Sequence, residues 1–125
     1  MSTQSLRVLV VDDEPAIADS LAEILRYNGH QAAAEYNAEQ AILTAGSLDP
    51  QVLISDVIMP DMNGIELANY FALHFPGCKV LLISGSETTT GLLNDAKRHG
   101  HEFAFMQKPI PPQLILDFLD HCDAP

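Results

Sequence analysis

Basic residues are scarce in this sequence, and the scarcity narrows the choice of partners. The 125 residues include 17 Asp and Glu but only 6 Lys and Arg, for a formal net charge of −11. Direct nucleic-acid binding needs a basic face, so this balance argues against it. The excess of carboxylates is compatible instead with a metal cation or a basic protein partner.

Long apolar runs and a basic leader are also missing. No apolar stretch approaches the ~20 residues that a membrane-spanning helix needs. The start, MSTQSLRVLVVDDEP, lacks a basic n-region, and its apolar run is too short for a signal peptide. Cys78 and Cys122 are the two cysteines and neither lies in a CxxC motif, so we expect buried or inert thiols. These features predict a soluble cytoplasmic protein.

The chain contains no internal repeat, low-complexity tract or linker that would divide it. Its length suits one domain, and the 47% of apolar residues are spread along it, as a single compact core requires. We expect one domain over residues 1–125, with a core of about 6–121 and no output domain in this chain.

Apolar strands alternate with helical periods five times, which indicates an α/β protein of parallel βαβ units with right-handed crossovers. The strand at 31–36 carries little branched apolar bulk and is expected at the outside of the sheet. The predicted strands are 6–11, 31–36, 51–55, 79–84 and 102–107, and the predicted helices are 15–29, 38–46, 64–75, 87–100 and 111–122.

Helical spacing also predicts which side chains face the core. The candidates are Ile17, Leu21, Ile24, Leu25 and Asn28 in the first helix, Leu67, Phe71 and Phe75 in the third, and Leu114, Ile115, Phe118, Leu119 and Cys122 in the last.

Polar residues stand at the carboxyl ends of four predicted strands. Asp12 and Asp13 follow the first strand, Asp56 the third and Lys108 the fifth, while Ser84 ends the fourth. In a parallel sheet these ends share one edge, where ligands bind. Three carboxylates, one hydroxyl and one ammonium therefore converge on a single rim.

Converging carboxylates with little local positive charge form a site for a hard divalent cation, and oxygen-only ligands favour Mg²⁺ over Zn²⁺. Lys108 can balance one carboxylate and later hold a phosphoryl oxygen, and Ser84 offers a hydroxyl. A metal, a lysine and a hydroxyl around one aspartate are what phosphoryl transfer to that aspartate needs.

The motifs VLVVDDEP, LISDVIMPDMNGIEL, VLLISG and KP occur in this order. With them the chain resembles a response regulator receiver domain of two-component signal transduction over about residues 6–121. The resemblance implies a flavodoxin-like, doubly wound (βα)5 fold whose five-stranded parallel sheet has the order 2-1-3-4-5.

The resemblance also implies roles at the site. Asp56 would be the phosphoacceptor, taking a phosphoryl group from the phosphohistidine of a sensor histidine kinase or a histidine phosphotransfer protein. Asp13, Asp56 and the backbone carbonyl of Ile58 would bind Mg²⁺ directly, and Asp12 would act through a water molecule. The product would be an aspartyl phosphate. The domain would not be an enzyme, because it would catalyse only its own phosphorylation and its own slow dephosphorylation.

Other implied roles concern the response to phosphorylation. Lys108 and Ser84 would stabilise the phosphoryl group, Ser84 and Phe105 would form the switch, and the Lys108–Pro109 peptide bond would be cis. A downstream protein or output domain would bind the face made by the helix at 87–100, the strand at 102–107 and the helix at 111–122, the fourth helix, fifth strand and fifth helix of the fold.

Four features depart from the family pattern. Ile58 is apolar where some members have a polar residue. Position 58 and position 86, here Ser86, are the two positions that tune the lifetime of the phosphate in this family. The aromatic at 105 is Phe, which donates no hydrogen bond, so any switch must work by packing. The spacing from Gly100 to Lys108 is one residue longer than usual.

Several alternatives stay open. An aspartyl-phosphate phosphatase would want a second acid two residues after the nucleophile, where Ile58 stands. A non-phosphorylated interaction domain would not need the acids, serine and lysine together, and a flavin-binding protein would need a phosphate loop after the first strand. Phe105 is equally compatible with a plain core position.

Overall fold

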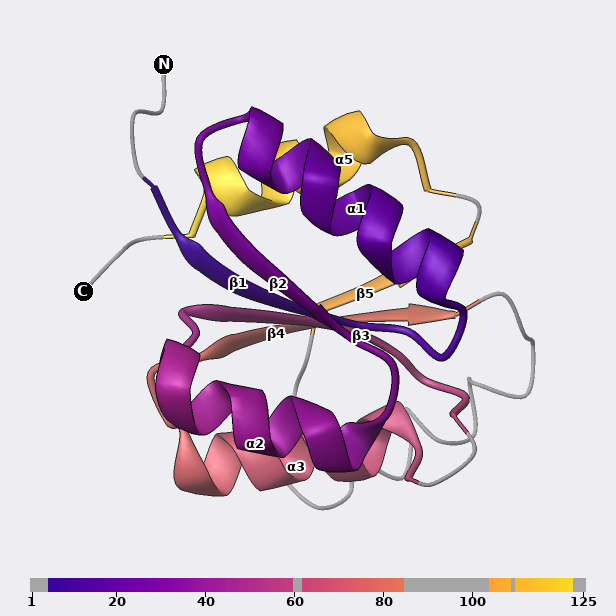
Figure 1. Ribbon diagram of the computed structural model, residues 1–125, viewed down its shortest axis with the longest axis vertical. Coiled ribbons are helices and arrows are strands. Elements are labelled where there is room, and N and C mark those ends of the chain that lie inside the picture. Colours follow the sequence, from indigo (N-terminus) through magenta and orange to yellow (C-terminus); the bar gives the residue numbers. More distant parts are fainter. Residues whose placement is uncertain (1–4, 60–61, 85–103, 109, 123–125) are drawn as a thin grey trace.

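The computed structural model describes residues 5–59, 62–84, 104–108 and 110–122 (Figure 1). Within these residues strands and helices alternate as the apolar pattern predicts. The elements are β1 (Arg7–Val11), α1 (Pro15–Tyr27), β2 (Gln31–Glu35), α2 (Ala38–Leu48), β3 (Val52–Asp56), α3 (Gly64–His74), β4 (Lys79–Ser84), β5 (Ala104–Gln107) and α5 (Pro112–Asp120). The helix predicted at 87–100 and the first two residues of the strand predicted at 102–107 lie outside the described residues.

The five strands form one parallel sheet in the order β2-β1-β3-β4-β5, so the predicted topology is confirmed. β1, β3 and β4 are the inner strands, and they are almost wholly buried because helices cover both faces. β2 lies at an edge, as its short side chains indicated. The predicted strand at 51–55 ends one residue too early, because β3 includes Asp56 as its last residue.

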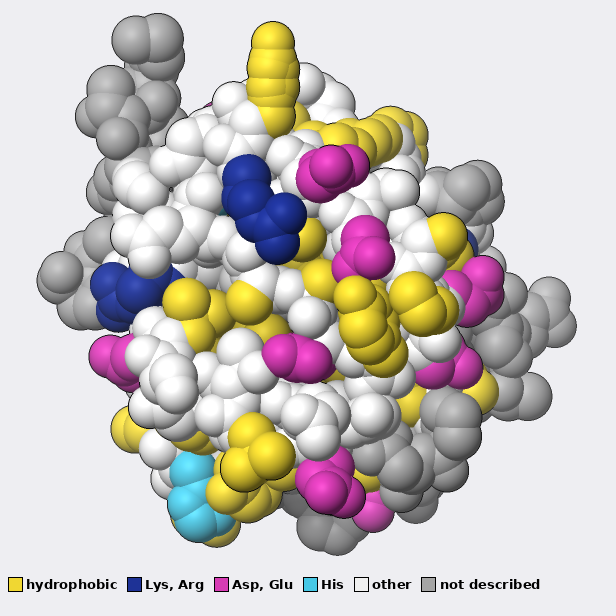
Figure 2. All heavy atoms as spheres, in the orientation of Figure 1, with side chains coloured by type: hydrophobic (Ala, Val, Ile, Leu, Met, Phe, Trp, Pro, Cys, Tyr) yellow, Lys and Arg dark blue, Asp and Glu magenta, His cyan; other side chains and the backbone are white. Residues whose placement is uncertain are grey.

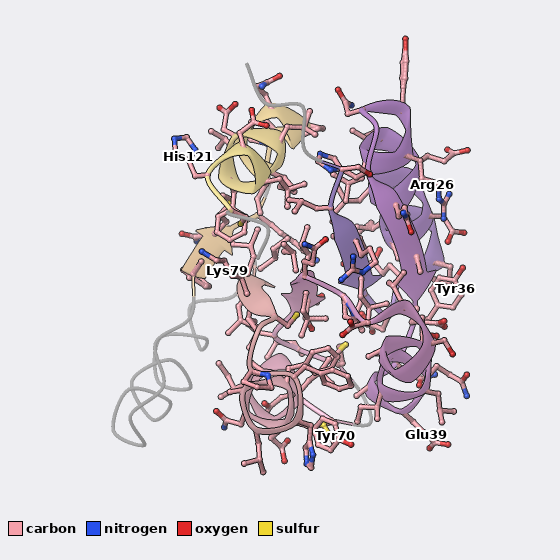
Figure 3. The ribbon with its side chains drawn as sticks, turned by 90° about the vertical axis from the view of Figure 1, so that its left-hand side faces the viewer. Arg26, Tyr36, Glu39, Tyr70, Lys79 and His121 are labelled. Carbon is pink, nitrogen blue, oxygen red and sulfur yellow. The ribbon has the colours of Figure 1, made fainter. Side chains whose placement is uncertain are left out.

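The helices form two layers, one on each face of the sheet. α1 and α5 cover one face, and α2 and α3 cover the other (Figure 1; Figure 3 shows the layers from the side). On the first face α1 and α5 pack over a core that includes Val10, Ile54 and Ile115. On the second face Leu53, Phe71 and Leu82 belong to the core beneath α2 and α3.

Side-chain caps define where α2 and α3 begin. The Asn37 side chain accepts a hydrogen bond of 2.8 Å from the Gln40 backbone N–H and so caps the start of α2. Asn63 accepts from the Glu66 N–H at 2.8 Å, and the Glu66 side chain accepts from the Asn63 N–H at 3.3 Å. This reciprocal capping box fixes the first turn of α3.

The buried face of α1 differs from the prediction. Ala18, Ala22 and Leu25 are the buried residues of this helix, whereas Ile17 is 40% exposed and Asn28 is exposed. Helical spacing placed Ile17 and Asn28 on the core face, but the small side chains of Ala18 and Ala22 are the ones fully buried. A similar shift leaves Leu114 of α5 half exposed, while Ile115 and Leu119 are buried as predicted.

The exposed edge of β2 is partly covered by a side chain of α1. The Arg26 guanidinium Nε donates a hydrogen bond of 2.9 Å to the carbonyl oxygen of Ala32 (Figure 3 shows Arg26 on this side). An edge strand presents such carbonyls for pairing with another chain, and a charged side chain is one of the usual ways to block them.

Acidic side chains outnumber basic ones on the surface near α1 and α2. Figure 2 shows them spread over this face, with few basic side chains among them. Among the described residues, no helix is long and apolar enough to cross a membrane.

Both cysteines are free thiols, as expected. Burial raises the pKa of the Cys78 thiol to about 12, and Cys122 is buried beside α5. A thiol with so high a pKa forms little thiolate, the reactive species, at neutral pH.

The turn before β2 contains a partly buried histidine, His30. His30 Nδ1 accepts a hydrogen bond of 3.2 Å from the Leu6 backbone N–H, which only the neutral ring can do in this way. Burial lowers the pKa of His30 below its ordinary 6.5, although Asp120 opposes the change.

We therefore predict that the free energy of unfolding falls as the pH is lowered from about 7 to about 5, because the unfolded state binds the proton first. Chemical denaturation at several pH values should show a smaller fall in His30→Asn, which keeps an acceptor but does not titrate. The remaining histidines are common to both proteins and cancel in the comparison. Equal pH dependence in the two proteins would contradict the prediction.

Candidate functional site

The carboxyl edge of the sheet brings three groups together from distant parts of the sequence. Asp12 follows β1, Asp56 is the last residue of β3, and Lys108 follows β5. Because all five strands are parallel, their carboxyl ends meet at this edge. The side chains of Asp12 and Asp56 are only 7% and 11% exposed, so their charges are held in a partly dry environment.

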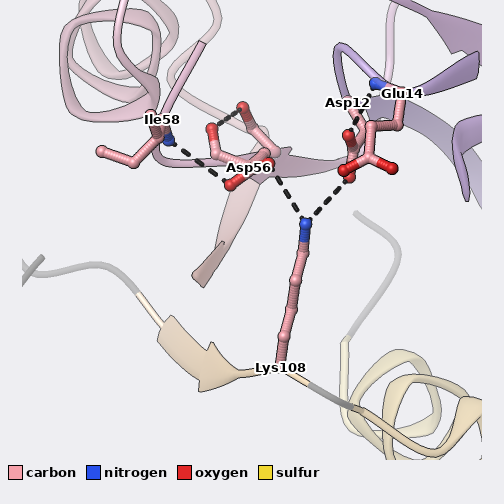
Figure 4. A network of polar contacts seen from close by, with 6 residues as sticks. Asp12, Glu14, Asp56, Ile58 and Lys108 are labelled. Atoms are coloured by element: carbon pink, nitrogen blue, oxygen red, sulfur yellow. Dashed lines mark hydrogen bonds and ion pairs between the residues drawn. The ribbon is translucent and has the colours of Figure 1, made fainter. Parts of the chain in front are cut away.

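One lysine contacts both buried carboxylates. Lys108 Nζ lies 3.3 Å from Asp12 Oδ2 and 3.2 Å from Asp56 Oδ2 (Figure 4). The backbone holds the lysine in place, since its N–H donates to the carbonyl oxygen of Ser84 at 2.8 Å. The ammonium group of Lys108, which follows the outer strand β5, therefore contacts the carboxylates at the ends of both β1 and β3.

Backbone amides orient the same two carboxylates. Asp12 Oδ1 accepts a hydrogen bond of 2.9 Å from the Glu14 N–H, at the start of α1. Asp56 Oδ1 accepts a longer one, 3.3 Å, from the Ile58 N–H (Figure 4). Each carboxylate thus uses one oxygen for an amide and the other for Lys108, and its rotation is restricted.

Negative charge exceeds positive charge at this edge. Burial raises the pKa of Asp56, and Asp12 raises it further, while Lys108 and the Ile58 amide act in the opposite direction. Burial tends to lower the pKa of Lys108, but the carboxylates of Asp56 and Asp12 hold it above its ordinary value. The lysine is therefore firmly protonated, yet it does not neutralise its neighbours.

The donor set suits a hard divalent cation. Carboxylate oxygens of Asp12, Asp13 and Asp56 all lie within 4.8 Å of one another, with Asp13 exposed to solvent. Oxygen donors of this kind are the ligands that Mg²⁺ prefers, and Mg²⁺ usually binds through one or two carboxylates while keeping several waters. A partly exposed cluster of three carboxylates fits that pattern.

Ser84 and Phe105 lie on neighbouring strands near this edge. Ser84 is buried at the end of β4, beside the strand that carries Asp56. Phe105 pairs in register with Leu82, and its side chain is 40% exposed. A core residue would be buried, so the alternative that Phe105 is a plain core residue is wrong. The switch roles of both residues stay predictions.

Gly64 at the start of α3 touches the backbone of Asp56 and Val57. A Cβ placed on Gly64 would lie 2.2 Å from the carbonyl oxygen of Asp56 and 2.8 Å from the Cα of Val57. The Gly64 N–H donates to the Val57 carbonyl oxygen at 2.6 Å. Glycine is required here by a close approach of two backbones.

Several predicted features lie outside the described residues. These are Pro109 and its cis peptide bond, Ser86, and Gly100. The capping box of Asn63 and Glu66 was missed by the sequence interpretation, although an Asn followed three residues later by Glu is its recognisable signal.

Comparison with known proteins is consistent with this geometry. Residues 8–120 match the response regulator receiver domain family. The chain is 36% identical over 84 residues to the probable transcriptional regulatory protein TcrX of Mycobacterium tuberculosis, covering 67% of this chain and 36% of that protein. It is 34% identical over 111 residues to a response regulator receiver protein of Anaeromyxobacter sp., covering 89% of this chain and 46% of that protein.

Among solved structures, a CheY-like receiver domain protein from Methanospirillum hungatei JF-1 has a TM-score of 0.79 and 27% identity. The match covers 93% of this chain and 91% of that one. The fold and the matched residues define a CheY-like signalling domain. The chain belongs to the response regulator receiver domain family of two-component systems. It spans half or less of the length of the curated relatives named above.

The contact at Gly64 yields a stability prediction. Gly64→Ala forces the backbone of Asp56 or of α3 to move, and overpacking of this kind costs about 1–3 kcal/mol of unfolding free energy. Urea denaturation should show the loss.

Gly46 in α2 is the matched control, because nothing lies within 4 Å of a Cβ placed there. Gly46→Ala should stabilise the helix by about 0.5–1 kcal/mol. Equal effects of the two substitutions would mean that the close approach at Gly64 has no energetic weight.

Proposed function

We propose that this domain accepts a phosphoryl group on Asp56 and responds by changing a partner-binding surface. The observation that carries the proposal is the placement of Lys108 Nζ between Asp12 and Asp56, 3.3 and 3.2 Å from their carboxylates. This arrangement holds one carboxylate oxygen for attack and places a cation where phosphoryl charge would develop. Family membership supports it and implies a histidine kinase as the source.

The transfer is a substitution at phosphorus. An Asp56 carboxylate oxygen forms a bond to the phosphorus of a phosphohistidine, and the phosphorus–nitrogen bond breaks. The imidazole leaves with the electron pair of that bond. Lys108 then exchanges its contact with Asp56 for one with a phosphoryl oxygen, so its charge follows the group. The Ser84 hydroxyl is proposed as a second donor to that group.

Mg²⁺, when bound, spreads the charge of the equatorial phosphoryl oxygens. Asp13 and Asp56 are the proposed direct ligands together with the backbone carbonyl of Ile58, and Asp12 is proposed to act through a water molecule. The amide contacts of Asp12 and Asp56 keep these oxygens oriented before the cation arrives.

The output is proposed to be a protein contact. The phosphoryl group adds charge at the edge of the sheet, and Ser84 and Phe105 are proposed to convert it into a change of the face that includes β5 and α5. The half-exposed ring of Phe105 can be buried or displaced by such a change. We further propose that residues 1–125 form a single receiver domain that acts in the cytoplasm.

The acceptor can be tested with a small phosphodonor. Incubation with phosphoramidate and Mg²⁺ should add one phosphoryl group that is labile to hydroxylamine, because it is an acyl phosphate. Asp56→Asn should abolish the addition, measured by intact-protein mass spectrometry. Asp117→Asn, an exposed position on α5, should leave it unchanged.

Phosphorylation that persists in Asp56→Asn, or that maps to Ser84, would contradict the assignment. No phosphorylation of the wild-type protein by any donor, with a folded domain, would favour the alternative of a non-phosphorylated interaction domain.

Metal binding can be tested by thermal unfolding. Mg²⁺ should stabilise the native state by about 1.4 kcal/mol at ten times its dissociation constant. For a domain of this size the melting temperature should rise by roughly 3–7 °C. Asp13→Asn should melt higher than wild type in EDTA, because repulsion is relieved, and should gain less from Mg²⁺.

Glu23→Gln removes one exposed acid from α1 and serves as the control for general surface charge. Its gain on adding Mg²⁺ should equal that of the wild type. If Mg²⁺ stabilises Asp13→Asn and wild type to the same extent, Asp13 is not a ligand of the cation.

A further inference from the structure

An apolar cavity of about 720 Å³ lies between α1 and α5, on the face of the sheet that these helices share. Its floor is formed by Val10, Ile54 and Ile83 from the three inner strands. Its walls include Ile17, Leu21 and Ile24 from α1 and Ile110, Pro112 and Ile115 from the α5 side. This volume falls in the range of pockets that hold small organic molecules.

The cavity follows from the composition of α1. Ala18 and Ala22 are the small side chains that this helix buries, and its larger side chains at 17, 21 and 24 line the cavity. They line a space between the two helices without filling it. From Ala16 to Ile24 the wall extends about 12 Å along the helix axis. The space is therefore elongated.

One end of the cavity is charged. Asp12, Asp56 and Lys108 line it in addition to the apolar residues. Two carboxylates against one ammonium leave one net negative charge at this end, and Asp13 stands next to it. A ligand suited to both ends has an extended apolar body and a cationic head.

We propose that this cavity is a binding site for small amphiphilic cations, with the apolar chain between α1 and α5 and the ammonium group beside Asp12 and Asp56. Binding here occupies the sheet edge next to the acceptor. The proposal requires neither a bound metal ion nor phosphorylation, so it stands apart from the proposed signalling function.

The first test uses hexyl-, heptyl- and octylammonium chloride with the wild-type protein in metal-free buffer, below their micelle concentrations. Burial of each added methylene should tighten binding by about fourfold. Methyl NMR should show shift changes at Ile17, Ile24 and Ile115 but not at the exposed Leu43 of α2. Affinity that does not vary with chain length would overturn the proposal.

The second test separates charge from apolar binding. Octylammonium should bind about tenfold more tightly than octanol, and octanoate should bind most weakly, because the charged end is negative. Asp12→Asn should reduce the preference for the ammonium over the alcohol. An equal affinity for all three probes would exclude the cationic part of the proposal.

The third test blocks the cavity. Ser20 lines it on α1 and is exposed, so Ser20→Trp places an indole across the opening. Octylammonium binding should weaken at least tenfold. Ser47→Trp is the matched control on the opposite helical layer and should bind as the wild type does.

Equal weakening by the two tryptophan substitutions, or none by either, would contradict the assignment of the site. If Ser20→Trp does not fold, the chain-length series and the methyl shifts of the wild type decide the question. The binding tests do not show whether Asp56 accepts a phosphoryl group. The phosphodonor experiment decides that question separately.

Discussion

Electrostatic repulsion between carboxylates at the end of the sheet is the constraint around which this domain is arranged. Parallel strands deliver Asp12 and Asp56 to one edge, and the chain supplies one lysine to separate them. Two amide contacts then hold the carboxylates in place. The arrangement leaves negative charge unbalanced, and the proposed binding of a divalent cation would offset it.

Much of this site could be predicted because the strands are clear in the sequence. Once the ends of the apolar runs are located, the parallel topology alone brings together the residues that follow them. Asp12, Asp56 and Lys108 are confirmed as neighbours in this way, and Asp13 lies with them. Their chemical roles rest on family resemblance and stay predictions, since proximity alone does not define a reaction.

The parts that sequence patterns missed depend on how closely two backbones or two layers approach. Helical spacing predicted Ile17 as a core residue, but α1 buries Ala18 and Ala22 instead. The need for glycine at position 64 arises from contact with the Asp56 carbonyl, about which periodicity says nothing. Both outcomes are decided by three-dimensional fit, which a one-dimensional pattern does not contain.

The position of Arg26 has a consequence for how copies of the domain can associate. Because its guanidinium occupies the Ala32 carbonyl, a strand adding to β2 would first have to displace that hydrogen bond and leave a charged group without it. Growth of the sheet from one molecule into the next is therefore disfavoured along this edge. On this side of the molecule, self-association would have to use side chains on the helical faces, where affinity can be adjusted residue by residue and reversed.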